Sequence, residues 1–201
     1  MTRTDDVAQE SALDEFRASG ALLEGHFLLS SGLHSSVYLQ CARVMMDPAR
    51  GERLCRALGD KIRASLPPEI LAEIDYCVSP AMGGVIVGYE LARALGKPSL
   101  FMERPDGEFM LRRGFSLPDG AGCLMVDDVV TTGKSSRECI AAIGRAGPRT
   151  QAAASLVNRT GVRADPGDSL ISLIVLYSPT HQSTTVPPKL ASSNTHLTLP
   201  T

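Results

Sequence analysis

The chain has 201 residues, a length that suits one domain with a full hydrophobic core. Hydrophobic residues make up 43% of it, charged residues 21%, and the formal net charge is −2. These values are ordinary for a globular protein. The small net charge excludes a strong overall electrostatic field that would attract nucleic acid or membrane. Local arrangements of residues must therefore bind any anionic ligand.

The first part of the chain is predicted to form a helix, a hairpin and a second helix. Residues 6–24 carry apolar side chains at roughly helical spacing, and Gly20 marks the end of this segment. Residues 26–40 indicate a hairpin, or a loop followed by a strand. Asp47 and Pro48 are typical of an N-cap and a first helical position, so a helix is expected from there to about residue 65, before two prolines.

Strands and helices then alternate along the chain. Short apolar runs predict strands at residues 74–79, 99–103, 122–126 and 152–157, and from 169 onward. Helices are expected at 85–95 and 136–146, and a polar loop or ribbon at 104–117. This alternation predicts an α/β fold with a parallel sheet flanked by helices on both faces. Ligands of such sheets bind at the carboxyl ends of the strands, where residues 80–84, 127–135 and 158–161 fall.

The strongest chemical signal is the run CLMVDDVVTTGKSS at residues 123–136. An apolar strand delivers Asp127 and Asp128, and a loop with two threonines and Gly133 leads into a helix. Unpaired amides at such a helix start bind phosphate, whereas carboxylates suit ribose hydroxyls or Mg²⁺. Together they describe a site for a ribose 5-phosphate; the alternative is a capped strand-to-helix connection with a solvated acid pair. The Walker A pattern is absent.

Three further segments each have a functional and a structural interpretation. Gly83 and Gly84 before a helix form either a tight turn or a set of amides for diphosphate. The adjacent Arg112 and Arg113 are either a solvated pair or cations that close over a phosphate. Arg159 at a strand end is either a salt-bridge residue or a bidentate partner for a carboxylate or imide edge.

The cysteines and the N-terminus bear on the cellular compartment. Five cysteines at wide spacing, with no CxxC pair, indicate neither a disulfide framework nor a zinc site. The start MTRTDDVAQE lacks the pattern of a secretory signal, and no run of about 18 apolar residues predicts a membrane span. We therefore expect a cytoplasmic protein.

The run VDDVVTTGKS at residues 126–135 closely resembles the motif by which type I phosphoribosyltransferases bind 5-phosphoribosyl-1-diphosphate (PRPP). The resemblance implies the fold of that family, a parallel sheet with a small N-terminal hood. It also implies that the two aspartates face the ribose hydroxyls and that residues 131–135 hold the 5-phosphate. The implied PRPP-binding residues are Asp127, Asp128, Val129, Val130, Thr131, Thr132, Gly133, Lys134 and Ser135.

Four more segments resemble orotate phosphoribosyltransferases in particular. They are GHFLLSSGLHSSVYLQ (25–40), SPAMGGVIVGYELARALG (79–96), MERPDGEFMLRRGF (102–115) and LVNRTG (156–161). The resemblance covers about residues 13–178 and implies one domain over 1–178, with a hood over about 13–45, a core over 46–178 and a loosely ordered tail at 179–201. The chain departs from the family at Ser30, where many members carry Lys, and at Asn158, where Asp often stands.

This second resemblance also implies residue roles. The diphosphate loop is Ala81, Met82, Gly83 and Gly84, the catalytic-loop cations are Arg104, Arg112 and Arg113, and the orotate-binding residues are Thr131 and Arg159. The implied reaction transfers the phosphoribosyl group of PRPP to orotate in the synthesis of UMP, with Mg²⁺ bound mainly through PRPP and not directly by the protein. A homodimer with the catalytic loop shared across subunits is implied as well, with neither nucleic acid nor membrane as a partner.

Two alternatives remain open from the residues alone. The first is a phosphoribosyltransferase for a purine or another base, against which Arg159 and the hood segment argue. The second is a regulator that senses PRPP without catalysis, which needs a surface for a partner or for nucleic acid. The chain shows no helix-turn-helix segment and no basic stripe, and its loop arginines favour an enzyme.

Overall fold

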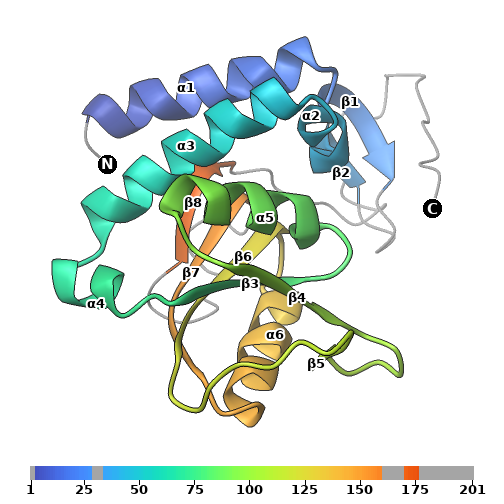
Figure 1. Cartoon of the computed structure of the whole chain (residues 1–201). Helices are drawn as coiled ribbons and strands as arrows, with labels where there is room; N and C mark the ends of the chain where they lie inside the picture. Colours follow the sequence, from blue (N-terminus) through green and yellow to red (C-terminus); the bar gives the residue numbers. More distant parts are fainter. Residues whose placement is uncertain (1–2, 29–33, 160–169, 177–201) are drawn as a thin grey trace.

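The structure, a computed structural model, describes residues 3–28, 34–159 and 170–176 (Figure 1). The helices are α1 (Arg3–Ala18), α2 (Cys41–Met45), α3 (Pro48–Ser65), α4 (Pro68–Ala72), α5 (Gly84–Leu95) and α6 (Lys134–Arg145). The strands are β1 (Leu22–Leu28), β2 (His34–Leu39), β3 (Tyr76–Pro80), β4 (Ser99–Glu103), β5 (Met110–Leu111), β6 (Gly122–Val130), β7 (Arg149–Asn158) and β8 (Leu170–Val175).

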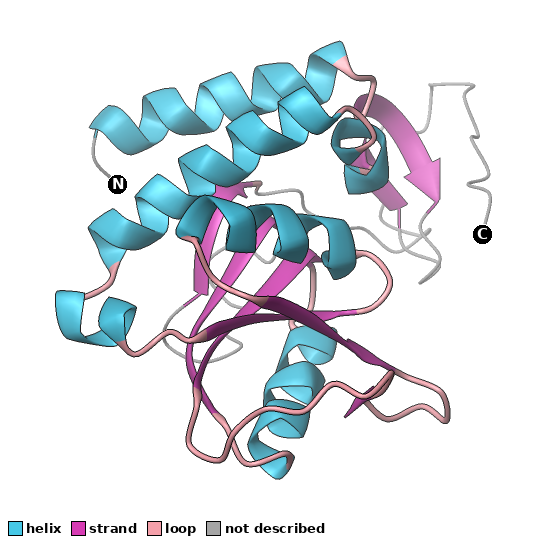
Figure 2. Cartoon of the chain, viewed as in Figure 1, coloured by secondary structure: helices cyan, strands magenta, loops and turns pink. Residues whose placement is uncertain are grey.

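A six-stranded sheet in the order β5-β4-β3-β6-β7-β8 forms the centre of the chain. All its neighbouring strands are parallel except β5, which pairs antiparallel with β4 at one edge. Helices α1, α3 and α5 lie over one face and α6 lies on the other (Figures 1 and 2). The predicted α/β fold, a mostly parallel sheet between layers of helices, is therefore confirmed.

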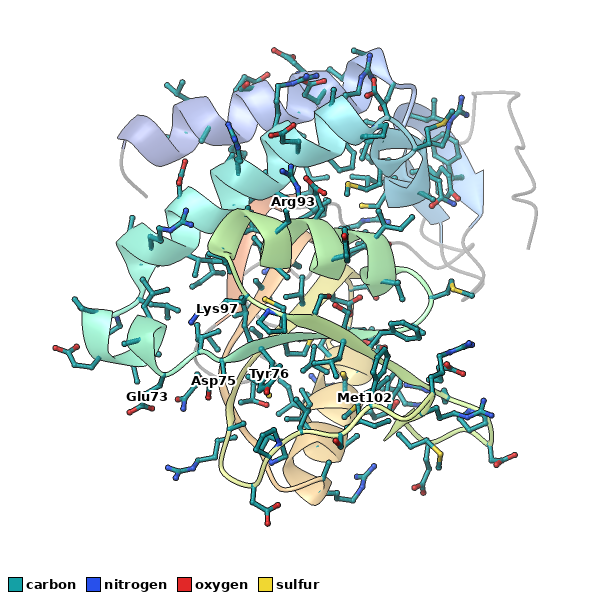
Figure 3. The ribbon with its side chains drawn as sticks, in the orientation of Figure 1. Glu73, Asp75, Tyr76, Arg93, Lys97 and Met102 are labelled. Carbon is teal, nitrogen blue, oxygen red and sulfur yellow. The ribbon has the colours of Figure 1, made fainter. Side chains whose placement is uncertain are left out.

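Apolar side chains fill the space on both sides of the sheet (Figure 3). On the face of α1, α3 and α5, one buried cluster includes Phe16, Leu58 and Leu91, each 0% exposed. A second cluster beneath α6 includes Met102 and Ile143. All five cysteines are buried and free. The sheet is thus covered on both faces, as parallel strands require.

The N-terminal segment forms a hairpin apart from the main sheet. Strands β1 and β2 pair antiparallel beside α2 (Figure 1), which confirms the predicted hairpin. The helix expected over residues 6–24 is wrong at both ends, because α1 begins at Arg3 and ends at Ala18. Gly20 adopts a left-handed φ of +65° that ends the helix, and Leu22 then pairs with Leu39 in the hairpin.

Local capping explains where α3 begins and where α4 appears. Asp47 Oδ1 accepts hydrogen bonds from the backbone N–H groups of Ala49 (3.0 Å) and Arg50 (3.4 Å), and Pro48 occupies the first helical position, as predicted. The prolines at 67 and 68 follow the end of α3, but Pro68 also begins α4, which was not expected. Proline suits a first helical turn, so a new helix begins at Pro68 soon after α3 ends at Ser65.

Three boundaries differ in ways that matter for the site. Strand β6 runs to Val130, so Asp127 and Asp128 lie within the strand and not after it, because pairing with β7 continues to Val130 and Asn158. The segment 104–117 contains the short strand β5, which pairs with β4. Helix α6 begins at Lys134, two residues before the expected start.

Some predictions lie outside what the structure describes. Residues 160–161 and the tail at 179–201 lie outside the described residues, and the division into a hood and a core within one domain stays a prediction. Within residues 3–28, 34–159 and 170–176, no helix has the length and apolar character needed to cross a membrane.

Candidate active site

The two adjacent carboxylates of β6 are held by hydrogen bonds at the carboxyl end of the strand. Asp127 is 6% exposed; its Oδ2 accepts a hydrogen bond from Ser136 Oγ (3.1 Å) and its Oδ1 accepts one from the Asp128 N–H (3.0 Å). Asp128 Oδ1 accepts from the Val129 N–H (2.8 Å). Both carboxylates are therefore oriented before any ligand arrives.

Burial changes the acidity of this pair. Burial, and then the charge of Asp128, raises the pKa of Asp127 to about 7. Burial also raises the pKa of Asp128. Such carboxylates lack full hydration, so hydroxyl groups of a polar ligand can replace water as their hydrogen-bond donors.

A pocket of about 240 Å³ lies between the end of β6 and the start of α6. It is lined by Arg104, Asp127, Val129, Val130, Thr131, Thr132, Gly133, Lys134, Ser135, Ser136 and Glu138. Gly133 stands at the helix cap with a φ of +70°, and Thr132 Oγ1 accepts a hydrogen bond from the Lys134 N–H (3.3 Å). The positive end of the helix dipole faces this pocket, an arrangement that binds phosphate.

The loop between β3 and α5 meets the acid pair. A Cβ placed on Gly83 would lie 2.8 Å from Asp128 Oδ2, so any larger residue there would displace the carboxylate. The Ala81 N–H donates to the Met102 carbonyl (2.8 Å), which fixes the loop to β4. Met82 is 85% exposed. Two loops predicted separately from the sequence thus converge on Asp128.

The cationic residues of segment 104–117 divide into two groups. Arg104 lines the pocket at the start of α6, where its Nη2 donates to Glu138 Oε2 (2.5 Å) and its Cζ lies 4.1 Å from the Phe109 ring centroid. Arg112 Nη1 donates to Glu103 Oε2 (3.1 Å). Arg113 also pairs with Glu103, and this bond is the main cause that lowers the Glu103 pKa. The structure therefore brings Arg104 to the pocket but leaves the other two arginines on Glu103.

Arg159 connects the main sheet to the hairpin. Its N–H donates to the Val130 carbonyl (2.8 Å) and its Nη2 donates to the Val37 carbonyl of β2 (3.2 Å). Burial lowers its pKa. The guanidinium group thus lies against β2 of the hairpin, and the backbone N–H of Arg159 pairs with the end of β6.

Comparisons with known proteins determine the family. The phosphoribosyl transferase domain family matches residues 50–191. The orotate phosphoribosyltransferase of Erythrobacter litoralis (strain HTCC2594) is 56% identical over 185 residues, which cover 92% of this chain and 94% of that protein. The orotate phosphoribosyltransferase of Phenylobacterium zucineum (strain HLK1) is 54% identical over 183 residues, or 91% of this chain and 92% of that protein. The chain belongs to the orotate phosphoribosyltransferase family.

Solved structures agree with this assignment. Orotate phosphoribosyltransferase from Aeropyrum pernix aligns with a TM-score of 0.62 at 28% identity, over 82% of this chain and 93% of that one. An adenine phosphoribosyltransferase from Thermoanaerobacter pseudethanolicus aligns with a TM-score of 0.57 at 18% identity, over 70% of this chain and 88% of that one. Because the adenine enzyme has a similar fold, the fold alone does not determine which base is the substrate. Side chains in the site must determine that specificity.

Three residues of this family member extend the site beyond the predicted set. Ser136 supports Asp127, Glu138 supports Arg104, and Cys41 Sγ lies 3.9 Å from the Asp128 carbonyl. The helical repeat from Gly133 could have indicated Ser136 and Glu138, which fall in the first turns of α6. Nothing in the sequence pattern could have placed Cys41, because its contact joins residues 87 positions apart.

Proposed function

We propose that this chain transfers the phosphoribosyl group of PRPP to orotate, giving orotidine 5′-phosphate and diphosphate, in the synthesis of UMP. The observation that carries the proposal is the convergence on Asp128 of two elements, the Gly83 loop and the strand that leads into the threonine pocket. An acid pair between two anion-binding helix starts suits a ribose with phosphate groups at both ends. The relatives that share 54–56% of the sequence are orotate phosphoribosyltransferases.

PRPP is assigned to three groups of residues. The backbone N–H groups and hydroxyls of residues 131–135 hold the 5-phosphate at the start of α6. Asp127 and Asp128 accept hydrogen bonds from the ribose hydroxyls. Residues 81–84 hold the diphosphate at the start of α5, where Gly83 lies against the Asp128 carboxylate. The contact between Gly83 and Asp128 supports a position for the diphosphate next to the ribose.

Orotate is assigned to the junction between β7 and the hood. Arg159 offers a planar fork of N–H donors, which fits the carboxylate or the imide edge of orotate. Thr131 adds a hydroxyl from the wall of the adjoining pocket. The hydrogen bond from Arg159 to Val37 couples this position to the hairpin.

The reaction breaks the bond between the anomeric carbon and diphosphate and forms a bond from that carbon to a ring nitrogen of orotate. The leaving diphosphate takes the bonding electron pair, and the nitrogen supplies the new pair. Orotate is an anion at its carboxylate near neutral pH; the attacking ring nitrogen loses its proton as the new bond forms, and the departing diphosphate can accept that proton. The side chains therefore contribute positioning, stabilisation of charge and exclusion of water by residues 104–117.

Mg²⁺ is the proposed cofactor, bound mainly by the oxygens of PRPP. Among the described residues no group of three or more His, Cys, Asp or Glu could hold a metal ion by itself. Two carboxylates beside the proposed phosphate pocket fit an ion that the substrate carries in. When bound, the ion neutralises charge on the diphosphate.

We also propose a cytoplasmic homodimer. Arg112 and Arg113 pair with Glu103 and do not line the pocket of their own chain, and we propose that they act in the active site of a second subunit. Met82 of the diphosphate loop and the α5 residues Ile86 and Tyr89 carry exposed apolar side chains, which offer an interface for a second copy. Five free cysteines are consistent with a reducing compartment.

The test is direct. The protein is mixed with PRPP, Mg²⁺ and orotate, and the loss of orotate absorbance is followed together with the release of diphosphate. Parallel reactions contain adenine, guanine or uracil in place of orotate. Turnover with orotate supports the proposal, turnover with only another base reassigns the base, and PRPP binding without turnover of any base indicates a regulator.

A further inference from the structure

Helix α5 approaches the sheet unusually closely through two glycines one turn apart. A Cβ on Gly84 would lie 3.0 Å from the Val126 carbonyl oxygen and 3.3 Å from the Ser79 Cβ. A Cβ on Gly88 would lie 1.8 Å from Ser79 Oγ, a distance that no real structure allows. Both glycines are buried, so α5 lies directly on the carboxyl ends of β3 and β6.

Ser79 is the residue that occupies the space left by Gly88. Its side chain is 1% exposed, and within the described part of the chain its hydroxyl has no hydrogen-bond partner. A buried hydroxyl without a partner does not favour folding, so hydrogen bonding does not explain the serine at this position. Its geometric effect is clear: Ser79 and Gly88 together set how closely α5 approaches the sheet.

We infer that Gly88 and Ser79 are positioning residues for the diphosphate loop. Gly83 immediately precedes α5, and the approach of α5 to β3 determines where Gly83 meets the Asp128 carboxylate. A shift of the helix away from the sheet moves the loop amides away from the acids that bind ribose. The spacing between the diphosphate site and the ribose site therefore depends on a contact that touches neither substrate; this inference rests on the proposed function.

A graded series of variants tests the contact. In Gly88→Ala the new Cβ would lie 1.8 Å from Ser79 Oγ. In Ser79→Ala/Gly88→Ala that hydroxyl is absent, and the nearest atom is the Cβ of residue 79 at 3.0 Å. In Ser79→Gly/Gly88→Ala the nearest remaining atom is Val126 Cβ at 3.9 Å. The KM for PRPP should decrease in that order. A displacement of about 1 Å can cost on the order of a hundredfold in kcat/KM, the upper limit expected for Gly88→Ala. The KM for orotate should change little.

Gly144→Ala is the matched control. Gly144 also lies within a helix, but a Cβ there would have nothing within 4 Å, so this variant should keep wild-type kinetics. Thermal denaturation and circular dichroism of every variant separate a moved loop from a lost fold. If Gly88→Ala does not fold, the order of the two double variants decides the matter.

An equal KM for PRPP across the folded variants, or an equal rise in both KM values, overturns the inference. Titration calorimetry with PRPP keeps this outcome separate from failure of the proposed function. If wild-type protein binds PRPP but does not consume orotate, the proposed base is wrong, and PRPP affinity across the series still tests the positioning contact.

Discussion

Ser136 Oγ donates a hydrogen bond of 3.1 Å to Asp127 Oδ2, which joins the first turn of α6 to the end of β6. Because the bond is buried, the helix start and the carboxylate keep a fixed distance. The proposed pocket for a phosphate and the proposed acceptor for a sugar hydroxyl therefore act as one unit. Such an arrangement favours ligands that carry both groups at the spacing of a ribose 5-phosphate.

The first prediction concerns the acid pair. In Asp127→Asn/Asp128→Asn each carboxylate becomes an amide with one acceptor oxygen, so charge-assisted bonds to ribose hydroxyls are lost. Each such bond contributes roughly 1.5–3 kcal/mol, so PRPP affinity should fall at least about tenfold to a hundredfold and turnover should almost cease. Calorimetric titration and rate measurements check this, with circular dichroism to confirm folding. Unchanged affinity and rate remove the acids from the site.

The second prediction is a pH dependence of stability. The folded pKa of Asp127 is about 7, above its ordinary value of 3.8, because of burial and the charge of Asp128. Between these two pH values the folded protein binds more protons than the unfolded chain, so the free energy of unfolding decreases as pH rises through this window. Asp127→Asn stays neutral and can still pair with Ser136 Oγ and the Asp128 N–H. Its Tm relative to wild type should therefore increase with pH.

Differential scanning calorimetry at about pH 5 and about pH 8 measures the effect. The control is Asp106→Asn, which removes an exposed carboxylate from the segment between β4 and β5. Equal Tm differences at the two pH values for Asp127→Asn, or the same trend in the control, contradict the assignment of the raised pKa to Asp127.

Local chemistry made much of this fold predictable. Asp47 and Pro48 marked the start of α3 because capping involves adjacent residues, and the apolar run before Asp127 marked β6 because its length and composition are local. The end of β6 could not be predicted, because it depends on pairing with β7. The end of α1 was missed since Leu23 continues the helical pattern but pairs with Tyr38.

The site divides in the same way. The motif at residues 126–135 identified the acids and the threonine loop, since both lie in one short segment. The contact of Gly83 with Asp128 and the contact of Arg159 with Val37 join residues far apart in sequence, so only the folded chain shows them. Arg104 is separated from the other two arginines because it pairs with Glu138, whereas Arg112 and Arg113 pair with Glu103. The sequence did not predict these pairs.

The third prediction concerns the base. Arg159→Ala should raise the KM for orotate far more than the KM for PRPP, by about tenfold to a hundredfold, because a charge-assisted bond to a carboxylate contributes roughly 1.5–3 kcal/mol. Since Arg159 also donates to the Val37 carbonyl, Arg159→Lys is the control: it keeps a charge but not the fork. Steady-state kinetics with each substrate varied in turn separate the effects. Equal rises in both KM values mean that Arg159 mainly supports the hood.

The last prediction concerns assembly. If Arg112 and Arg113 act in the site of a partner subunit, as their absence from the lining of their own pocket suggests, then Arg112→Ala/Arg113→Ala and Asp127→Asn/Asp128→Asn should complement each other. Each is expected to be inactive alone. After random exchange, about half of the dimers are mixed and one of the two sites in each is whole, so about a quarter of wild-type activity should return. If each chain uses its own arginines, the mixture regains no activity.

A quadruple variant that carries all four substitutions sharpens this test. Mixed in equal amount with wild type, it leaves about a quarter of full activity if the site is shared, because both sites of every mixed dimer then lack one part. If each chain completes its own site, about half remains. Native mass spectrometry confirms that subunits have exchanged, and dilution below the dimer dissociation constant should abolish activity only in the shared arrangement. Once exchange is shown, two results together contradict a shared site: no activity returns in the first mixture, and about half of full activity remains in the second. The loop then acts in the active site of its own chain.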